Sequence, residues 1–168
     1  KKISKAKIYD VYGPTETTIW STLKEITNDD IIDIGRPIGN TQVYILDDKL
    51  KIVPIGIEGE LYIAGDGVGK GYLNRDDLTS ERYLKNPYLE NSIIYQTGDA
   101  CKFDSEGNLH YLGRKDGQIK IRGLRIELEE IEKRILEFKG IKKAKVIKQT
   151  IGNREIISAY YIASKRIK

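Results

Sequence analysis

The sequence has few of the residues that most often make covalent cross-links or metal sites. Among 168 residues there are one cysteine, one histidine and no methionine. A lone cysteine forms no internal disulfide, and Cys101 has no CxxC motif or Cys/His cluster around it, which excludes a disulfide scaffold and a structural zinc site. This cysteine usage is typical of a reducing compartment, so we expect a cytoplasmic protein.

Long apolar runs are also missing. No uncharged stretch is long enough to span a membrane, and the chain has no basic-then-apolar leader of the signal-peptide type. We therefore expect no membrane partner. Because a natural translation product begins with methionine and this chain begins with Lys1, we also expect it to be a piece of a longer protein.

Charge is present in both signs but is unevenly placed. The net charge is +4, yet residues 1–116 hold 15 basic and 19 acidic side chains, whereas residues 117–168 hold 14 and 6. A basic segment can attract nucleic acid, an anionic surface or an acidic protein, and a solvated lysine-rich face explains it equally well. The basic run over 139–148 lacks interleaved aromatic residues, so we expect no nucleic-acid partner.

Short strand patterns alternate with turn signals through the first two thirds of the chain. The expected strands cover residues 7–12, 42–46, 60–64, 92–96, 100–103 and 109–112. A short helix is expected over 76–83, because acidic residues stand in its first turn. Strands this short and this regularly interrupted predict a β-barrel or sandwich.

A different pattern follows toward the C-terminal end. Residues 118–122 are expected to form half of a hairpin, and an amphipathic helix is expected over 127–138, with Gly140 just past its end. The helix pattern rests on four apolar residues at helical spacing: Leu128, Ile131, Ile135 and Phe138. Two strands over 144–149 and 155–162 complete a small α+β unit.

Three clusters carry side chains of chemical interest. The first, Tyr12-Gly13-Pro14-Thr15-Glu16, is a bend with an aromatic ring, a hydroxyl and a carboxylate on one rim, suited to a nucleotide base, a phosphate and Mg²⁺. Taken alone, such a cluster is more often a turn followed by a helix cap. The second cluster is Tyr95-Gln96-Thr97-Gly98-Asp99, and the third runs from Gly113 to Glu127.

With these clusters in this order, the sequence closely resembles the adenylate-forming, AMP-binding enzymes. Within them it is most similar to the amino-acid-activating adenylation domains of nonribosomal peptide synthetases. Gly35-Arg36-Pro37-Ile38 and the stretch from Gly59 through Leu73 add to the resemblance. The glycine-rich residues 65–71 lack the Walker pattern of Gly, Lys and Ser or Thr, so we expect a barrel turn there.

The resemblance implies an α+β fold in two parts. Residues 1–115 would be the C-terminal, β-barrel-like portion of the large AMP-binding subdomain, and residues 116–168 an incomplete small C-terminal subdomain. Asp116 would be the hinge about which the small subdomain turns between two half-reactions. The family's phosphate loop and its late catalytic lysine are not in the chain, so we expect these 168 residues to be inactive alone.

The implied activity has two steps. An amino acid carboxylate attacks the α-phosphate of ATP, with Mg²⁺, to give aminoacyl-AMP and pyrophosphate; the phosphopantetheine thiol of a peptidyl carrier protein or domain then displaces AMP. A condensation domain is a further implied partner. The alternatives are an acyl-CoA ligase, a D-alanine-to-carrier ligase, and a non-enzymatic binding or docking module.

The resemblance also assigns nucleotide contacts residue by residue. Tyr12 and Tyr111 would hold the adenine ring by stacking, and Asp99 would accept both ribose hydroxyls. Arg114 would reach the ribose or phosphates, and Arg125 the phosphate region. The alternatives are an ordinary barrel aromatic at Tyr12 or Tyr111 and a turn or cap aspartate at Asp99.

Three further residues would act on the phosphates and the thiol. Glu16 would be the Mg²⁺ ligand, Thr15 would touch the phosphates, and Lys120 would lie beside the tunnel for the phosphopantetheine arm. A surface strand lysine is the alternative at Lys120, and a core tryptophan is the alternative at Trp20. The residues that would line the amino-acid pocket are Val11, Gly13, Ile19 and Trp20.

Overall fold

The chain divides into two structural units. The computed structural model describes residues 6–27, 33–115, 119–121, 124–152 and 154–164. The backbone of residues 1–115 packs mainly against itself, and so does the backbone of residues 116–168. The division is at the residue where the sequence analysis divides the chain, and the assignment of the two parts as subdomains stays a prediction. Asp116, the expected hinge, lies outside the described residues.

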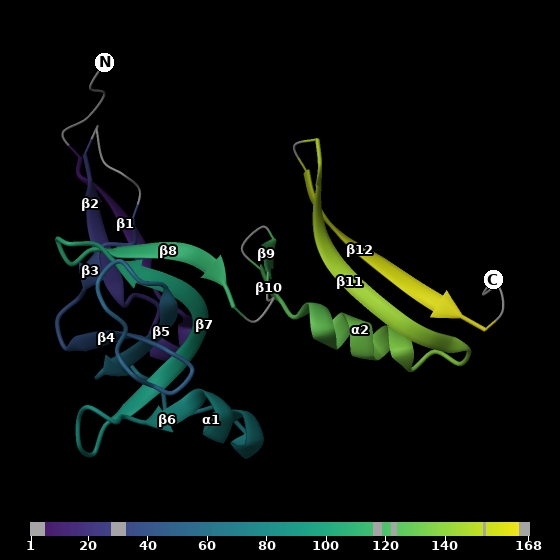
Figure 1. Ribbon diagram of the computed structural model, residues 1–168, viewed down its shortest axis with the longest axis horizontal. Helices are drawn as coiled ribbons and strands as arrows, with labels where there is room; N and C mark the ends of the chain where they lie inside the picture. The colour runs from purple at the N-terminus through teal and green to yellow at the C-terminus, as the bar shows by residue number, and fades with distance from the viewer. Residues whose placement is uncertain (1–5, 28–32, 116–118, 122–123, 153, 165–168) are drawn as a thin grey trace. The chain divides into compact units, whose positions relative to one another are not determined.

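The first unit is built from two antiparallel sheets (Figure 1). The smaller sheet contains, in spatial order, β1 (Ile8–Tyr12), β2 (Thr22–Ile26) and β3 (Arg36–Pro37). The larger sheet contains, in spatial order, β4 (Thr41–Leu46), β5 (Gly59–Gly65), β7 (Ile93–Phe103) and β6 (Tyr83–Lys85), with β8 (Leu109–Arg114) also paired to β7. The remaining elements are the one-turn 3₁₀ helix η1 (Thr15–Thr17) and the helix α1 (Asp76–Arg82).

Strand β5 lies at the centre of the core, between β4 and β7. Leu61 and Ile63 pack into one buried cluster, while Tyr62 and Ala64 pack into another. A strand covered on both faces has a continuous apolar sequence rather than an alternating one, as this strand does. Cys101 is fully buried in the first cluster, and burial raises the pKa of its thiol to about 12.

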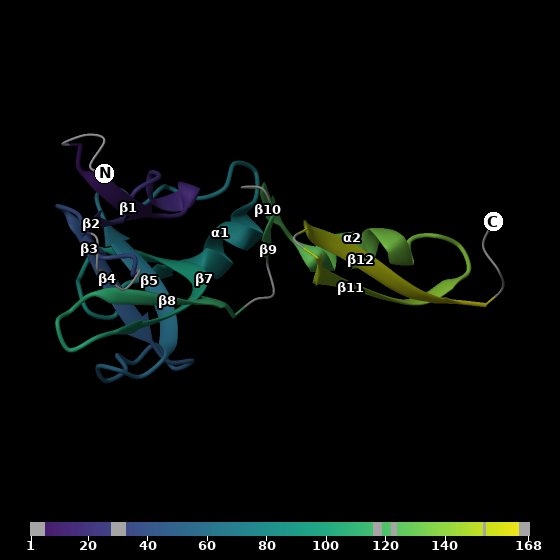
Figure 2. The ribbon, with the colours of Figure 1, turned by 90° about the horizontal axis from the view of Figure 1, so that it is seen from above.

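One long strand takes the place of two expected strands. The sequence predicts a break between residues 96 and 100, whereas β7 is continuous from Ile93 to Phe103 (Figure 2). Gly98 has a φ of 76°, and the register of β5 against β7 shifts beside it, so the strand passes through a bulge-like irregularity instead of ending. At the same place β7 changes partner from β6 to β8, and Asp99 is the first residue paired with β8.

Three short strands of the first unit are not predicted by the sequence patterns. β3 and β6 have two and three residues, which is too short for a period of two to be recognised. β2 carries Lys24 and Glu25 in its middle, and these charges interrupt its apolar pattern. Each of the three is held in place by pairing with a neighbour rather than by its own sequence.

The second unit is a small α+β unit. Its elements are β9 (Ile119–Ile121), β10 (Leu124–Ile126), α2 (Leu128–Leu136), β11 (Ile141–Ile151) and β12 (Arg154–Ala163). β9 pairs with β10 and β11 with β12, both antiparallel, and α2 packs against β11. The helix ends before Phe138, which is 63% exposed, so the expected apolar stripe is one residue too long.

A carboxylate ties α2 to β11. Glu132 Oε1 accepts hydrogen bonds from the Val146 N–H at 2.7 Å and from Lys145 Nζ at 2.9 Å, and these contacts lower the pKa of Glu132.

Among the described residues, no helix has the length and apolar character needed to cross a membrane. The sheet-rich first unit and the α+β second unit confirm the predicted fold class.

Candidate active site

The carboxylate of Asp99 is the centre of the candidate site. This buried side chain accepts a hydrogen bond at Oδ1 from Arg114 Nη1 at 2.9 Å, and the two residues are direct partners across β7 and β8. Its Oδ2 accepts a hydrogen bond from the hydroxyl of Tyr12, at the end of β1. Residues that the sequence placed in three separate motifs therefore meet at one carboxylate.

Side chains provide hydrogen-bond partners for the backbone around Asp99, where the pairing of β5 with β7 is irregular. Thr97 Oγ1 donates to the Leu61 carbonyl at 2.7 Å and accepts from the Asp99 N–H at 3.0 Å. The Gly98 N–H donates to Glu60 Oε1 at 3.1 Å. Because buried backbone groups require partners, these bonds fix the position of the Asp99 backbone within the sheet.

Tyr12 and Tyr111 stand near each other but in different surroundings. Their ring centroids are 6.4 Å apart, at an angle of 38° between the planes. Tyr12 packs against the core, and burial together with the negative charge of Asp99 raises the pKa of its phenol far above the usual value, so the hydroxyl stays a donor. Tyr111 is 45% exposed, which leaves much of its ring accessible for stacking.

Glu16, on η1, belongs to a second polar cluster. Its Oε1 accepts a hydrogen bond from the Tyr72 hydroxyl at 2.6 Å, and that hydroxyl lies 3.3 Å from the hydroxyl of the fully buried Tyr95. The backbone carbonyl of Glu16 accepts from the Gly69 N–H at 2.8 Å. The sequence analysis missed Tyr72 and Gly69, although glycine at every second position from 65 to 71 was an available signal.

The possible metal ligands near Glu16 suit Mg²⁺ that is bound together with a nucleotide better than a metal ion that is held by protein side chains alone. Among the described residues, no group of three or more His, Cys, Asp or Glu side chains gathers to hold a metal ion. Mg²⁺ is commonly held by one or two carboxylates together with waters and substrate phosphates. A single carboxylate at Glu16 fits Mg²⁺ bound with a nucleotide.

A strained loop follows the first motif. Thr18 and Ile19 have φ angles of 62° and 72°, a left-handed conformation that is costly for a β-branched residue and is often found at functional sites. A Cβ on Gly13 would lie 2.4 Å from the Ile19 carbonyl oxygen, so this packing requires glycine. Ile19 and Trp20, on this loop, are 66% and 57% exposed, and Val11, on β1, is 37% exposed, so none of the three lies in the core of the first unit.

The other expected site residues are only partly defined. Thr15 begins η1 and is exposed. The backbones of Lys120 and Arg125 are partners in the register of β9 and β10. Their side chains and all of Asp116 lie outside the described residues, so their roles stay predictions.

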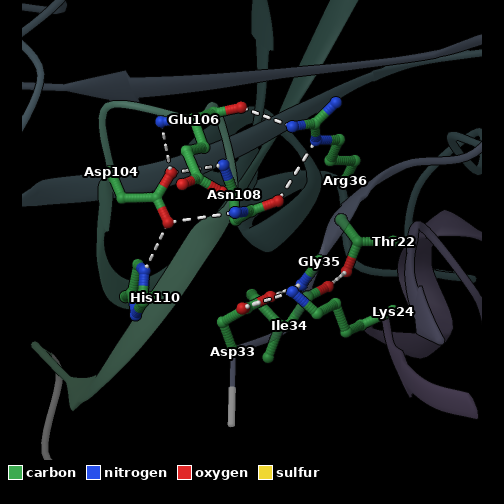
Figure 3. A network of polar contacts seen from close by, with 10 residues as sticks. All are labelled: Thr22, Lys24, Asp33, Ile34, Gly35, Arg36, Asp104, Glu106, Asn108 and His110. Atoms are coloured by element: carbon green, nitrogen blue, oxygen red, sulfur yellow. Dashed lines mark hydrogen bonds and ion pairs between the residues drawn. The ribbon is translucent and has the colours of Figure 1, made fainter. Parts of the chain in front are cut away.

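A separate polar network holds the turn between β7 and β8 (Figure 3). Asp104 pairs with His110 Nε2 at 3.0 Å and accepts from Asn108 Nδ2 at 3.0 Å. Arg36 Nε donates to Asn108 Oδ1 at 3.1 Å, and its guanidinium also reaches the Glu106 carbonyl. The hydrogen bonds from His110 and Asn108 lower the pKa of Asp104, and the bonds from Arg36 connect β3 to the turn, so the network has a structural role.

Comparison with known proteins relates these residues to a family. Residues 1–73 match the family model described as AMP-binding enzyme. The chain is 46% identical over 164 residues to bacitracin synthase 3 of Bacillus licheniformis, covering 95% of this chain and 3% of that protein. It is 42% identical over 164 residues to tyrocidine synthase 3 of Brevibacillus parabrevis, covering 95% and 2%. The chain thus spans only a few per cent of the length of these curated relatives.

Solved structures give the same result. A four-domain nonribosomal peptide synthetase bound to AMP and glycine is 42% identical, with a TM-score of 0.63 over 96% of this chain and 12% of that one. An NRPS protein containing adenylation and PCP domains is 28% identical, with a TM-score of 0.80 over 94% and 33%. The chain therefore belongs to the AMP-binding enzyme family and corresponds to part of an adenylation domain of the nonribosomal peptide synthetase type.

Proposed function

We propose that the protein containing this chain activates an amino acid as aminoacyl-AMP and passes it to a carrier-bound phosphopantetheine thiol. The observation that carries the proposal is the convergence of Tyr12, Asp99 and Arg114 from three separate motifs. The likeness to synthetases supports the choice of substrate class, and the likeness to proteins with PCP domains supports a peptidyl carrier partner. A condensation domain is a further proposed partner.

Asp99 has the capacity to bind a ribose. The two oxygens of a carboxylate offer about four acceptor positions, of which Tyr12 and Arg114 each use one. The remaining positions are suited to the two ribose hydroxyls. Arg114 balances the negative charge of the buried carboxylate, and Tyr111 offers an accessible ring for the base.

The first step needs positioning and charge neutralisation rather than a protein nucleophile. A carboxylate oxygen of the amino acid bonds to the α-phosphorus of ATP, and the bond from that phosphorus to pyrophosphate breaks. Glu16 would hold Mg²⁺, which supplies positive charge at the phosphates when bound, and Thr15 and Arg125 would contact the phosphates. Val11, Ile19 and Trp20 would face the amino acid.

The second step involves the other unit. The thiol sulfur bonds to the aminoacyl carbonyl carbon as the bond to AMP breaks. Lys120 would lie beside the phosphopantetheine arm, and Asp116 would act as the hinge between the two half-reactions. The boundary between the two units at residue 116 supports a hinge at this place.

Exchange of labelled pyrophosphate into ATP tests the proposal. The full-length protein is assayed with the standard amino acids, D-alanine and fatty acids, beside an Asp99→Ala variant. We expect exchange with one or a few amino acids and a loss of at least about 100-fold in the variant, because two ribose contacts and the buried ion pair disappear together. Exchange with fatty acids alone would indicate an acyl-CoA ligase, and exchange with D-alanine alone a D-alanine-to-carrier ligase. If the protein binds no AMP and Asp99→Ala changes nothing, the chain is a docking module instead.

A further inference from the structure

Residues 65–72, here named the glycine loop, run directly against the segment that carries Glu16. The Gly69 N–H donates to the Glu16 carbonyl at 2.8 Å, and Thr18 Oγ1 donates to the Gly67 carbonyl at 2.7 Å. These two bonds lie on either side of Thr17, which is buried. The loop therefore binds the main chain of Glu16 before this point and the side chain of Thr18 after it, although the sequence suggests only a barrel turn.

The alternating glycines make this close approach possible. A Cβ on Gly67 would lie 2.9 Å from the Thr17 carbonyl oxygen, and one on Gly69 would lie 3.2 Å from that of Glu16. Gly71 has a φ of 130°, and a Cβ there would lie 2.4 Å from a methyl of Thr79. Any side chain at these positions would push the loop away from η1 or from α1.

Tyr72 ends the glycine loop and reaches the carboxylate of Glu16. Its N–H donates to Thr79 Oγ1 at 2.9 Å, and its ring meets that of Tyr83 edge to face, with centroids 5.6 Å apart. The hydroxyl donates to Glu16 Oε1 at 2.6 Å, with the Tyr95 hydroxyl behind it.

We propose that Tyr72 is a positioning residue for Glu16: the glycine loop holds the backbone of Glu16, and the Tyr72 hydroxyl fixes the orientation of its carboxylate toward a nucleotide-bound cation. This inference rests on the proposed role of Glu16 toward Mg²⁺. Groups that hydrogen-bond to a metal ligand typically change metal affinity or activity by about 10- to 100-fold. In this account Tyr72 contacts neither the nucleotide nor the metal ion. Removal of its hydroxyl therefore weakens binding of the cation more than binding of the nucleotide.

Tyr72→Phe tests the inference, with Tyr83→Phe as the matched control. Both changes remove one phenol hydroxyl from the same aromatic group, and among the hydrogen bonds of the described residues it is the Tyr72 hydroxyl that donates to Glu16. The full-length protein is mixed with a non-reacting ATP analogue, and Mn²⁺ binding is measured by electron paramagnetic resonance. We expect Tyr72→Phe to weaken Mn²⁺ binding about 10-fold and to raise the Mg²⁺ concentration for half-maximal exchange similarly, while Tyr83→Phe resembles wild type.

A second variant covers the case in which Tyr72→Phe is poorly folded. Gly69→Ala crowds the Glu16 carbonyl by only a few tenths of an ångström and should produce the same cation defect more weakly. Equal Mn²⁺ affinity in wild type and Tyr72→Phe, or a loss of thermal stability with an unchanged cation requirement, overturns the inference. Absence of exchange in the wild-type protein with every acid would instead overturn the proposed function, and Mn²⁺ binding would still report on Tyr72.

Discussion

The contact between Tyr12 and Asp99 allows a quantitative test of how the site is held together. Tyr12→Phe removes the hydroxyl that donates to a buried carboxylate, and hydrogen bonds to charged groups contribute about 1.5–3 kcal/mol. Asp99→Ala removes the same bond and also breaks the pair with Arg114, whose side chain is 15% exposed against 8% for Asp99. Removing one partner of a buried ion pair costs about 3–5 kcal/mol.

A double-mutant cycle separates the shared bond from the rest. The double variant loses the hydroxyl–carboxylate bond only once, so its loss of stability should be about 1.5–3 kcal/mol smaller than the sum of the two single losses. Guanidinium unfolding followed by far-ultraviolet circular dichroism gives the free energies, and Tyr83→Phe serves as a control for loss of a phenol hydroxyl. A coupling below about 0.5 kcal/mol, the usual error of additivity, would refute the claim that Tyr12 and Asp99 act together.

Two further predictions concern the first unit. Tyr12 has a raised pKa in the folded state, so the unfolded chain releases its phenol proton first. The free energy of unfolding should therefore fall as pH rises above about 10, by up to about 1.4 kcal/mol per pH unit from this residue; an unchanged free energy of unfolding between pH 8 and 11 would contradict this. Gly35→Ala should lower the free energy of unfolding by about 2–5 kcal/mol, because φ is 73° and the new Cβ would lie 2.0 Å from a carbonyl oxygen of β2. Gly107→Ala, with φ of 81° and open space around it, should lower it by about 1–2 kcal/mol in the same unfolding assay. Equal losses would show that the crowding at Gly35 relaxes freely.

Much of the fold is readable from local patterns. The expected strands over 42–46, 60–64 and 109–112 correspond to β4, β5 and β8, and the helices over 76–83 and 127–138 correspond to α1 and α2. Turn residues or acidic residues stand at the ends of these elements, and each element is long enough for its pattern of apolar side chains to be recognised. Local propensity and the tertiary structure agree for these elements.

The misplaced elements depend on partners distant in sequence. Gly98 has the character of a turn residue, yet β7 continues through it because β5 pairs with this strand along one edge while β6 and β8 share the other. β2 becomes a strand because β1 and β3 lie on either side of it. No local pattern encodes pairing of that kind, since the stabilising bonds come from other strands.

The sequence alone carries the motifs and their order, and the resemblance that these motifs support names the family and the candidate residues. Which of these residues meet follows only from the folded chain. Folding brings Tyr12 and Arg114 to opposite oxygens of Asp99. It also brings Tyr72 to Glu16 across 56 positions of sequence. These contacts arise from strand pairing and from the close approach of a glycine-rich backbone, and both depend on parts of the chain that are far apart in sequence.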